Sequence, residues 1–298
     1  SRSASVMLSF ISYEMTGAPC ALGTFERRHM LNTLREILQE NWQWRNQIMN
    51  LAVIDLHKTV RGAVLGWIWL LVKPVTYIAV FWFALELGLR ASSGVTEYPY
   101  ILWLSCGLIP WFFMSDLLNT GANIYRRYPF LVNRIHFPLS SISLFYALSQ
   151  FIIFLMLMAL LLIACVVKGY ALSVYALQLV PVSLLMLVFW TMFSVMVSGL
   201  SALSKDFLNL LKAATQPLFW ISGVIYNLSN LPYHTVTKIL AFNPVTFFCE
   251  AFRACLCDKY WLWDKPSLLV PFLVVFALTL VVMLWNYKKL RKDVADVL

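Results

Sequence analysis

Six long apolar runs, separated by shorter polar segments, dominate the 298-residue chain. Each run is at least as long as the stretch of about 20 residues that an α-helix needs to cross a bilayer. Apolar residues within the runs are continuous and do not alternate with polar ones, which favours helices over barrel strands. The sequence therefore predicts an all-α integral membrane protein with six transmembrane helices, at 64–89, 100–120, 139–167, 172–203, 207–226 and 267–286.

The region before the first span, residues 1–63, predicts a helix with one apolar side. That side carries Leu31, Leu34, Leu38, Trp42, Arg45 and Met49 at helical spacing. Arg27, Arg28 and Arg35 lie near this stripe. We interpret the segment as an amphipathic interfacial helix along the inner leaflet of the membrane. A helix docked on a partner protein is the alternative.

The stretch between the fifth and sixth spans, residues 227–266, is too long for a simple connector. Its apolar pieces are too short to cross a bilayer, and Pro232, Pro244 and Pro266 interrupt them. Irregular backbone at membrane depth must be covered by protein or line a water-filled path. We therefore expect extracellular re-entrant helices here, placed as an outer gate.

Composition and charge support a membrane location and set the topology. The chain is 61% hydrophobic and only 12% charged, whereas soluble domains carry about 25% charged residues. Sixteen Lys and Arg residues fall in segments predicted to be cytoplasmic and six in segments predicted to lie outside. The positive-inside rule then places both termini, including the basic tail 287–298, in the cytoplasm. The net charge of +9 forms no long basic face, so no nucleic-acid partner is expected.

Motifs of enzymes and metal sites are missing from the sequence. No glycine-rich loop precedes a Lys-Ser or Lys-Thr pair, no HExxH occurs, and no serine lies in a GxSxG elbow. We therefore expect this chain to have no catalytic residue and to bind no metal or cofactor. Cys249, Cys255 and Cys257 are close in sequence, and either a disulfide or unpaired packing thiols would account for them.

Several motifs occur together from about residue 50 to the C-terminus. They lie in residues 55–74, 81–83, 88–90, 103–113, 124–138 and 242–253. In these stretches the chain resembles the ABC-2-type permeases that export polysaccharides, most closely the wall teichoic acid exporter permeases. O-antigen and capsule exporter permeases are near relatives of that group. The chain departs from the family pattern at Ile54, Val60 and Ala63.

The resemblance implies that residues 64–298 form the transmembrane domain of an exporter permease in a bacterial cytoplasmic membrane. Such a permease works as two copies with two cytoplasmic ATPase subunits, which bind ATP and magnesium, and it carries a lipid-linked polymer. It also implies a coupling segment at 123–137 that docks on the ATPase; an ordinary basic loop is the alternative. The coupling residues would be Tyr125, Arg126, Arg127, Leu131, Arg134 and Phe137.

Two further groups of residues are candidates for contact with the polymer. Substrate access and the channel are assigned to Asp55, Lys58, Arg61, Trp67, Trp69, Lys73, Tyr77, Trp82, Phe112 and Phe113, and the outer gate to Asn243, Pro244, Glu250 and Arg253. Lys73 either meets a phosphate of the substrate or extends to the inner interface. The aromatic side chains either stack on sugars or form a lipid-facing belt. Glu86 and Arg90 are spaced to form an ion pair.

Other functions are weighed against export of a wall teichoic acid-like polymer. Export of O-antigen or capsular polysaccharide is the nearest alternative. A membrane-embedded transferase acting on lipid-linked sugars is more distant, because no paired carboxylates facing one leaflet are visible. An ion channel or proton-coupled transporter would show a line of carboxylates at membrane depth or inverted repeats, and neither is found.

Overall fold

The computed structural model describes residues 19–88, 98–133, 137–170, 172–228 and 234–297 of the chain. Every regular element within those residues is a helix, which confirms the predicted all-α fold. Five helical segments among them are long and apolar enough to cross a bilayer. These are Ile68–Gly88, Tyr100–Arg127, Leu139–Val167, Val174–Leu203 and Pro266–Trp285.

The fifth predicted span corresponds to a shorter helix, α10 (Lys205–Ile221). Its 17 residues extend for roughly 25 Å at about 1.5 Å per residue, less than the bilayer core of about 30 Å. The helix ends at Ser222, and Gly223 then adopts a positive φ of 69° that turns the chain away. The count of six spanning helices therefore stays a prediction.

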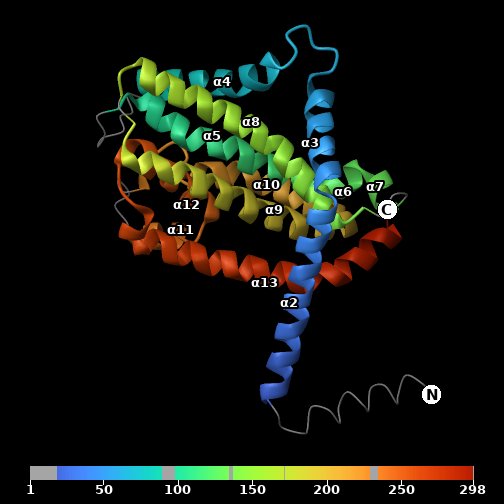
Figure 1. The fold of residues 1–298 in the computed structure, drawn as a ribbon. Coiled ribbons are helices and arrows are strands. Elements are labelled where there is room, and N and C mark those ends of the chain that lie inside the picture. Colours follow the sequence, from blue (N-terminus) through green and yellow to red (C-terminus); the bar gives the residue numbers. More distant parts are fainter. Residues whose placement is uncertain (1–18, 89–97, 134–136, 171, 229–233, 298) are drawn as a thin grey trace, which may run out of the picture.

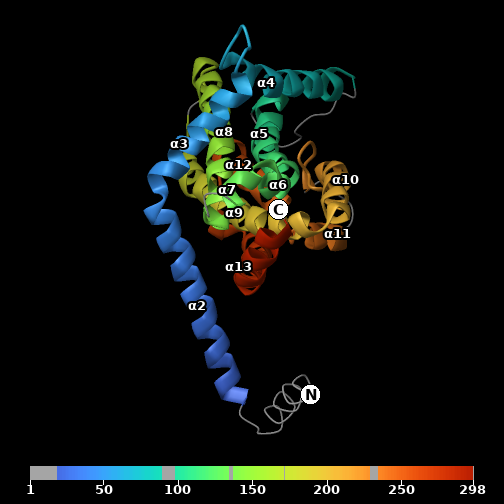
Figure 2. The same ribbon diagram turned by 90° about the vertical axis from the view of Figure 1, so that its right-hand side faces the viewer.

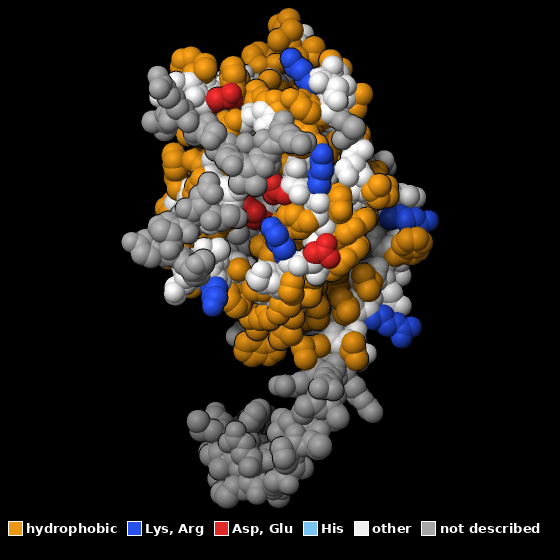
Figure 3. Space-filling view, turned by 90° about the vertical axis from the view of Figure 1, so that its left-hand side faces the viewer, with side chains coloured by type: hydrophobic (Ala, Val, Ile, Leu, Met, Phe, Trp, Pro, Cys, Tyr) orange, Lys and Arg blue, Asp and Glu red, His pale blue; other side chains and the backbone are white. Residues whose placement is uncertain are grey.

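The long helices lie side by side in Figure 1. They are α4 (Ile68–Trp82, continued by a π-helical turn at Phe83–Gly88), α5 (Tyr100–Asn119), α8 (Leu139–Val167), α9 (Leu179–Leu203) and α13 (Pro266–Val297). Two short helices, α6 (Ile124–Arg127) and α7 (Pro129–Asn133), lie at one end of this bundle, and α11 (His234–Leu240) and α12 (Pro244–Arg253) lie towards the other. Following the predicted topology, we call these the inner and outer ends. Figure 3 looks onto the outer end, where Lys, Arg, Asp and Glu side chains lie among hydrophobic ones.

Two N-terminal helices, α2 (Pro19–Gln43) and α3 (Arg45–Val60), cross the bundle axis near its inner end (Figures 1 and 2). They pack on the bundle through a buried side that includes Ile37, Ile48 and Ala52. The apolar stripe predicted from the sequence is largely on the other side, where Leu38 and Trp42 are exposed. An exposed apolar stripe on a helix that lies across the spans suits contact with the membrane interface.

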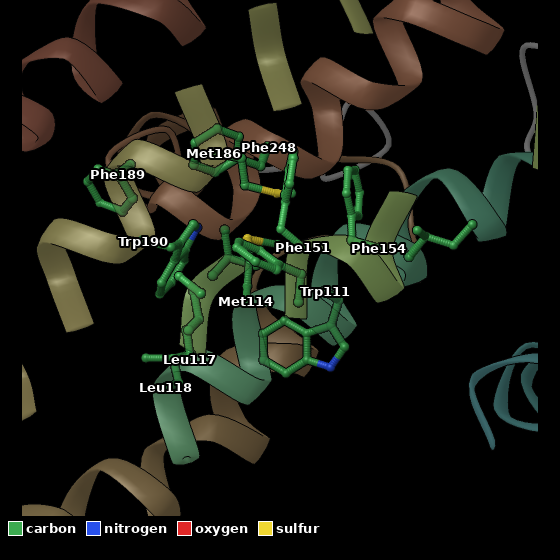
Figure 4. Packing of buried hydrophobic residues seen from close by; sticks show 14 of the residues in the cluster. Trp111, Met114, Leu117, Leu118, Phe151, Phe154, Met186, Phe189, Trp190 and Phe248 are labelled. Atoms are coloured by element: carbon green, nitrogen blue, oxygen red, sulfur yellow. The ribbon is translucent and has the colours of Figure 1, made fainter. Parts of the chain in front are cut away.

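The core of the bundle forms around α5, which is buried along most of its length. Figure 4 shows how its Trp111, Met114 and Leu117 meet aromatic side chains of α8 and α9. Phe247 of α12 and Phe272 of α13 stack with ring centroids 3.8 Å apart and extend this core towards the outer end. Because α5 is surrounded by protein, its neighbours α4 and α10 supply the more exposed surfaces on which a site can form.

Candidate functional site

A cavity of about 290 Å³ lies between α4, α5 and α10, and we call it the aromatic groove. It is lined by Lys73, Tyr77, Phe81, Trp111, Phe112, Asp116, Gln216 and Phe219, among others. The ring of Phe219 lies 5.4 Å from that of Phe81 and 5.3 Å from that of Trp111. Phe219 therefore joins α10 to both of the other helices that form the groove.

A second cavity, of about 260 Å³, lies among α3, α4, α5 and α8 and shares Lys73 and Asp116 with the aromatic groove. Sequence reasoning found no opposite charge near Lys73 on its own helix. The structure places Asp116 of α5 in the lining of both cavities together with Lys73, and Arg127 also lines the second cavity. Ionisable groups at membrane depth usually occupy such positions, facing a cavity or a partner.

The other residues assigned to substrate access and the channel are distributed over several places. The second cavity is lined by Asp55, Trp69 and Phe113, and the aromatic groove is lined by Tyr77. Phe112 lines both cavities. The rest do not line either cavity and lie elsewhere. Trp67 contacts His57 at 4.8 Å, Lys58 lies over the Tyr128 ring, Arg61 ends α3, and Trp82 donates to Glu86. The predicted partner of Glu86, Arg90, lies outside the described residues.

The inner segment formed by α6 and α7 holds the predicted coupling residues. Several are buried: Tyr125 donates to the Leu139 carbonyl at 3.1 Å, Leu131 is in the core, and Phe137 packs against Trp44 at 4.9 Å. Arg126 is also engaged within the chain, because it donates to the Ala202 carbonyl at 2.8 Å. Tyr125, Leu131 and Phe137 are thus buried and shape the segment, while Arg126 is half-buried. Arg134 lies outside the described residues.

The exposed tip of this segment is made by other residues. Arg127 and Pro129 are exposed, and the side chain of Phe130 is 47% exposed at the inner end. An exposed aromatic beside an arginine is typical of the anchors at protein interfaces. The sequence analysis named Arg127 but missed Phe130. The available signal for Phe130 was the adjacent Pro129, which begins a short helix.

The outer end contains a fully buried arginine, Arg253 of α12. Its guanidinium donates to the carbonyls of Gly223 at 2.7 Å and Val224 at 2.6 Å, and to Glu250 Oε1 at 3.0 Å. The same group lies 3.6 Å from the ring centroid of Trp103 in α5. Arg253 thus holds together α5, α12 and the turn that follows α10.

The turn after α10, residues 222–225, is irregular backbone whose carbonyl groups are all bonded by side chains. Arg253 takes the middle two, while Thr246 donates to the Ser222 carbonyl at 3.1 Å and Tyr100 to the Ile225 carbonyl at 2.9 Å. Irregular backbone inside a membrane protein needs such partners, because no lipid group can replace them. We call residues 222–225 with these side-chain donors the outer clamp.

Two further contacts tie α12 to the outer clamp. Asn243 accepts from the amide of Val245 at 3.0 Å as the N-cap of α12, and its amide donates to the Ser222 hydroxyl at 2.7 Å. Pro244 occupies the first turn, where its missing N–H costs nothing. A methyl group on Gly107 of α5 would lie only 2.5 Å from the Val224 carbonyl, so glycine is required there. The predicted outer-gate residues therefore lie together around this turn.

Charge and thiol chemistry at the outer end are both dominated by burial. Burial raises the pKa of Glu250 above its usual range, against the opposing effect of the Arg253 charge. Cys257 lies 3.7 Å from Cys106 of α5, measured between sulfur atoms, and both are free thiols. Cys249 and Cys255 are likewise buried and unpaired by disulfide. Of the two interpretations left open by the sequence, the structure therefore contains packing thiols.

No group of three or more His, Cys, Asp or Glu side chains that could hold a metal occurs among the residues described. The groups that line the aromatic groove are suited to recognition of a ligand. Aromatic faces line a groove beside one lysine and one carboxylate, and this groove lies between a tip at the inner end and a clamp at the outer end.

Comparison with known proteins gives one matching family and several relatives. The sequence profile of the family "ABC-2 type transporter" matches residues 46–257. The chain is 20% identical over 250 residues to the O-antigen export system permease protein RfbA of Myxococcus xanthus, covering 84% of this chain and 92% of the relative. Two proteins of the same description from Klebsiella pneumoniae are 22% and 21% identical, each covering 82% of this chain and 92% of the relative.

Proposed function

Because this chain belongs to the ABC-2 type transporter family, we propose that it is the permease subunit of an exporter that moves a lipid-linked polysaccharide across a bacterial cytoplasmic membrane. The observation that carries the proposal is the match to O-antigen export permeases over more than four-fifths of both chains. The aromatic groove supports it, since aromatic faces stack on sugar rings without fixing one register. The chain itself is a transport component, and ATP and magnesium would be bound by a separate ATPase subunit.

The nature of the polymer is the finer part of the proposal. The relatives found are O-antigen permeases, which favours an O-antigen-like polysaccharide, and a wall teichoic acid-like polymer stays a prediction. Both classes are carried on a lipid through phosphate. Lys73, placed beside sugar-stacking aromatics in the groove, would contact such a phosphate.

A second copy of the chain would complete the pathway. Of the most apolar stretch of the Ile68–Gly88 span, only 6% is buried inside the chain. This span nevertheless forms one wall of the aromatic groove. A wall so little covered on its other sides suits contact with lipid or with another copy. We propose a homodimer with two ATPase subunits, in which both termini and the α6–α7 tip face the cytoplasm.

Docking of the ATPase is tested by Phe130→Asp. An aromatic hot-spot residue contributes about 2 kcal/mol or more to binding, so the affinity of the permease for the ATPase should fall by roughly thirtyfold and less ATPase should copurify. The measurement is the amount of ATPase retained by the purified permease. Phe130 is the sharper choice over the arginines because Arg126 is bonded inside the chain.

The matched control is Trp263→Asp, which alters another exposed aromatic side chain (63% exposed) in the 227–266 stretch predicted to lie outside. It should leave the complex intact. A Phe130→Asp permease that still retains a full complement of ATPase would contradict docking at this tip.

The substrate is tested by depletion of the protein in living cells. Loss of the permease should strand a lipid-linked polymer on the cytoplasmic face, where carbohydrate analysis of extracted lipids identifies it. Sugar repeats of an O-antigen type would support the favoured proposal, and a polyol phosphate polymer would support the teichoic acid-like one. An unchanged profile of lipid-linked polymers would contradict export of this class.

A further inference from the structure

Asp55 is a buried carboxylate in α3, with only 3% of its surface exposed. Its two oxygens accept hydrogen bonds from two different parts of the chain. The Tyr128 hydroxyl donates to Oδ1 at 2.5 Å, and the Ser149 hydroxyl of α8 donates to Oδ2 at 2.8 Å. A carboxylate this deeply buried is costly without such partners, so its bonds fix where α3 lies relative to both.

Tyr128 is the residue that joins α6 to α7 in the inner segment. Besides its bond to Asp55, its ring is approached by the Lys58 ammonium at 5.1 Å and packs against Phe145 at 5.4 Å. Burial and the bond to Asp55 raise the pKa of Tyr128 to about 12, so the hydroxyl stays a donor at physiological pH. Two residues of α3, one turn apart, therefore contact a single side chain of the inner segment.

The C-terminal end of α3 is packed against the start of α4. Leu56 and Val60 form one buried cluster with Leu70 of α4. The connection between the helices is kept short by Gly62 and Gly66, whose φ angles of 82° and 52° allow a tight reversal. A displacement of α3 is therefore carried into α4, which forms one wall of the aromatic groove.

We propose that the hydrogen bond between Tyr128 and Asp55 transmits movement of the inner segment to α3 and, through it, to α4. Asp55 and Tyr128 are then positioning residues that couple the ATPase cycle to the width of the aromatic groove. Transmission of this kind needs a continuous chain of packed and bonded groups between the two sites, which these contacts provide. The inference rests on the proposed function and adds the path by which the two ends communicate.

The test uses the complete complex of permease and ATPase in membrane vesicles loaded with the lipid-linked polymer extracted from depleted cells. Tyr128→Phe removes the hydroxyl and keeps the ring contacts, so the complex should still assemble and hydrolyse ATP. The amount of polymer exported per ATP hydrolysed should fall about tenfold, which is within the usual range of coupling between two sites. Ser149→Ala is the matched control, because it removes the other bond of Asp55 and leaves the link to the inner segment. It should keep export per ATP near the wild-type value.

If Tyr128→Phe fails to fold, the same hydrogen bond can be tested from its other partner by comparing Asp55→Asn with Asp55→Ala. The amide oxygen can still accept from Tyr128 and the amide nitrogen can donate to Ser149, so export per ATP should stay well above the value of Asp55→Ala. Asp55→Ala, which loses both bonds, should show the uncoupled behaviour. Export per ATP that stays at the wild-type value in Tyr128→Phe, or that falls equally in Tyr128→Phe and Ser149→Ala, would overturn the proposal. An Asp55→Asn value no higher than that of Asp55→Ala would overturn it as well. Failure of the wild-type complex to export any polymer would instead refute the proposed function.

Discussion

Replacement of Arg253 by methionine is expected to abolish export and to lower the unfolding temperature of the purified protein sharply. The change leaves the Gly223 and Val224 carbonyls without donors and Glu250 without its counter-charge. Breaking a buried ion pair by removing one partner costs about 3–5 kcal/mol. This is a large part of the roughly 5–15 kcal/mol that stabilises a typical domain. Thermal unfolding in detergent and export from vesicles measure the two effects.

Arg253→Lys separates charge from geometry at the same site. Lysine keeps the positive charge but cannot present the planar set of donors that reaches two carbonyls and a carboxylate together, so an intermediate loss is expected. Lys265→Met is the control, because this exposed cation lies over Tyr260 at 3.9 Å and holds no buried carbonyl. An Arg253→Met protein that unfolds at the wild-type temperature and exports normally would show that the outer clamp does not depend on this residue.

The outer clamp shows which part of the fold could be predicted from the sequence. Prolines and short apolar pieces predicted re-entrant helices at 227–266, whereas residues 222–225, which form the irregular turn of the clamp, fell inside the predicted fifth span. The identity of the side chains around this turn was not predictable. Tyr100 and Trp103 belong to a helix more than a hundred residues earlier, and only packing brings them to Ile225 and Arg253.

In the inner segment, the predicted coupling residues are of types that occur at interfaces, and their role in docking stays a prediction. Arginine and aromatic residues are typical of interfaces, but sequence alone does not reveal which side of a short helix is covered. Tyr125 and Leu131 turned out to lie in the core, and Arg126 bonds to the end of α9. Phe130, one residue before Leu131, is the aromatic that remains exposed.

Span prediction worked where a run of apolar residues was long enough to outweigh its interruptions. It was weakest for α10, where Lys212, Pro217 and Gly223 interrupt the run and the helix has only 17 residues. The same interruption has a structural role, because the chain leaves the helix at Ser222 and forms the outer clamp. Leu208 near the start of α10 packs with Ala122 and Val197, and the bonded turn holds its other end, so the helix is fixed along the groove.

Phe219 of α10 is the side chain through which the helix contacts the groove, and Phe219→Ala is expected to reduce export strongly. Its ring, 3% exposed, bridges Phe81 and Trp111 across the aromatic groove. Truncating a buried phenylalanine to alanine costs about 3–5 kcal/mol, and here the loss falls on the contact between α10 and the weakly held α4. We expect the groove to open where Phe219 now contacts Phe81 and Trp111. Export should then fall, and vesicles containing the permease should leak a small dye.

The neighbouring Trp220 supplies the control for this change, because it lies on the same helix but is 52% exposed. Trp220→Ala removes a larger aromatic side chain than Phe219→Ala does, yet it leaves both contacts across the groove in place. Export and dye retention should therefore stay near wild-type values. Equal losses in the two variants would mean that α10 needs aromatic side chains only for its placement in the membrane. A loss confined to Phe219→Ala would identify the contacts between α4, α5 and α10 as the closure of the groove.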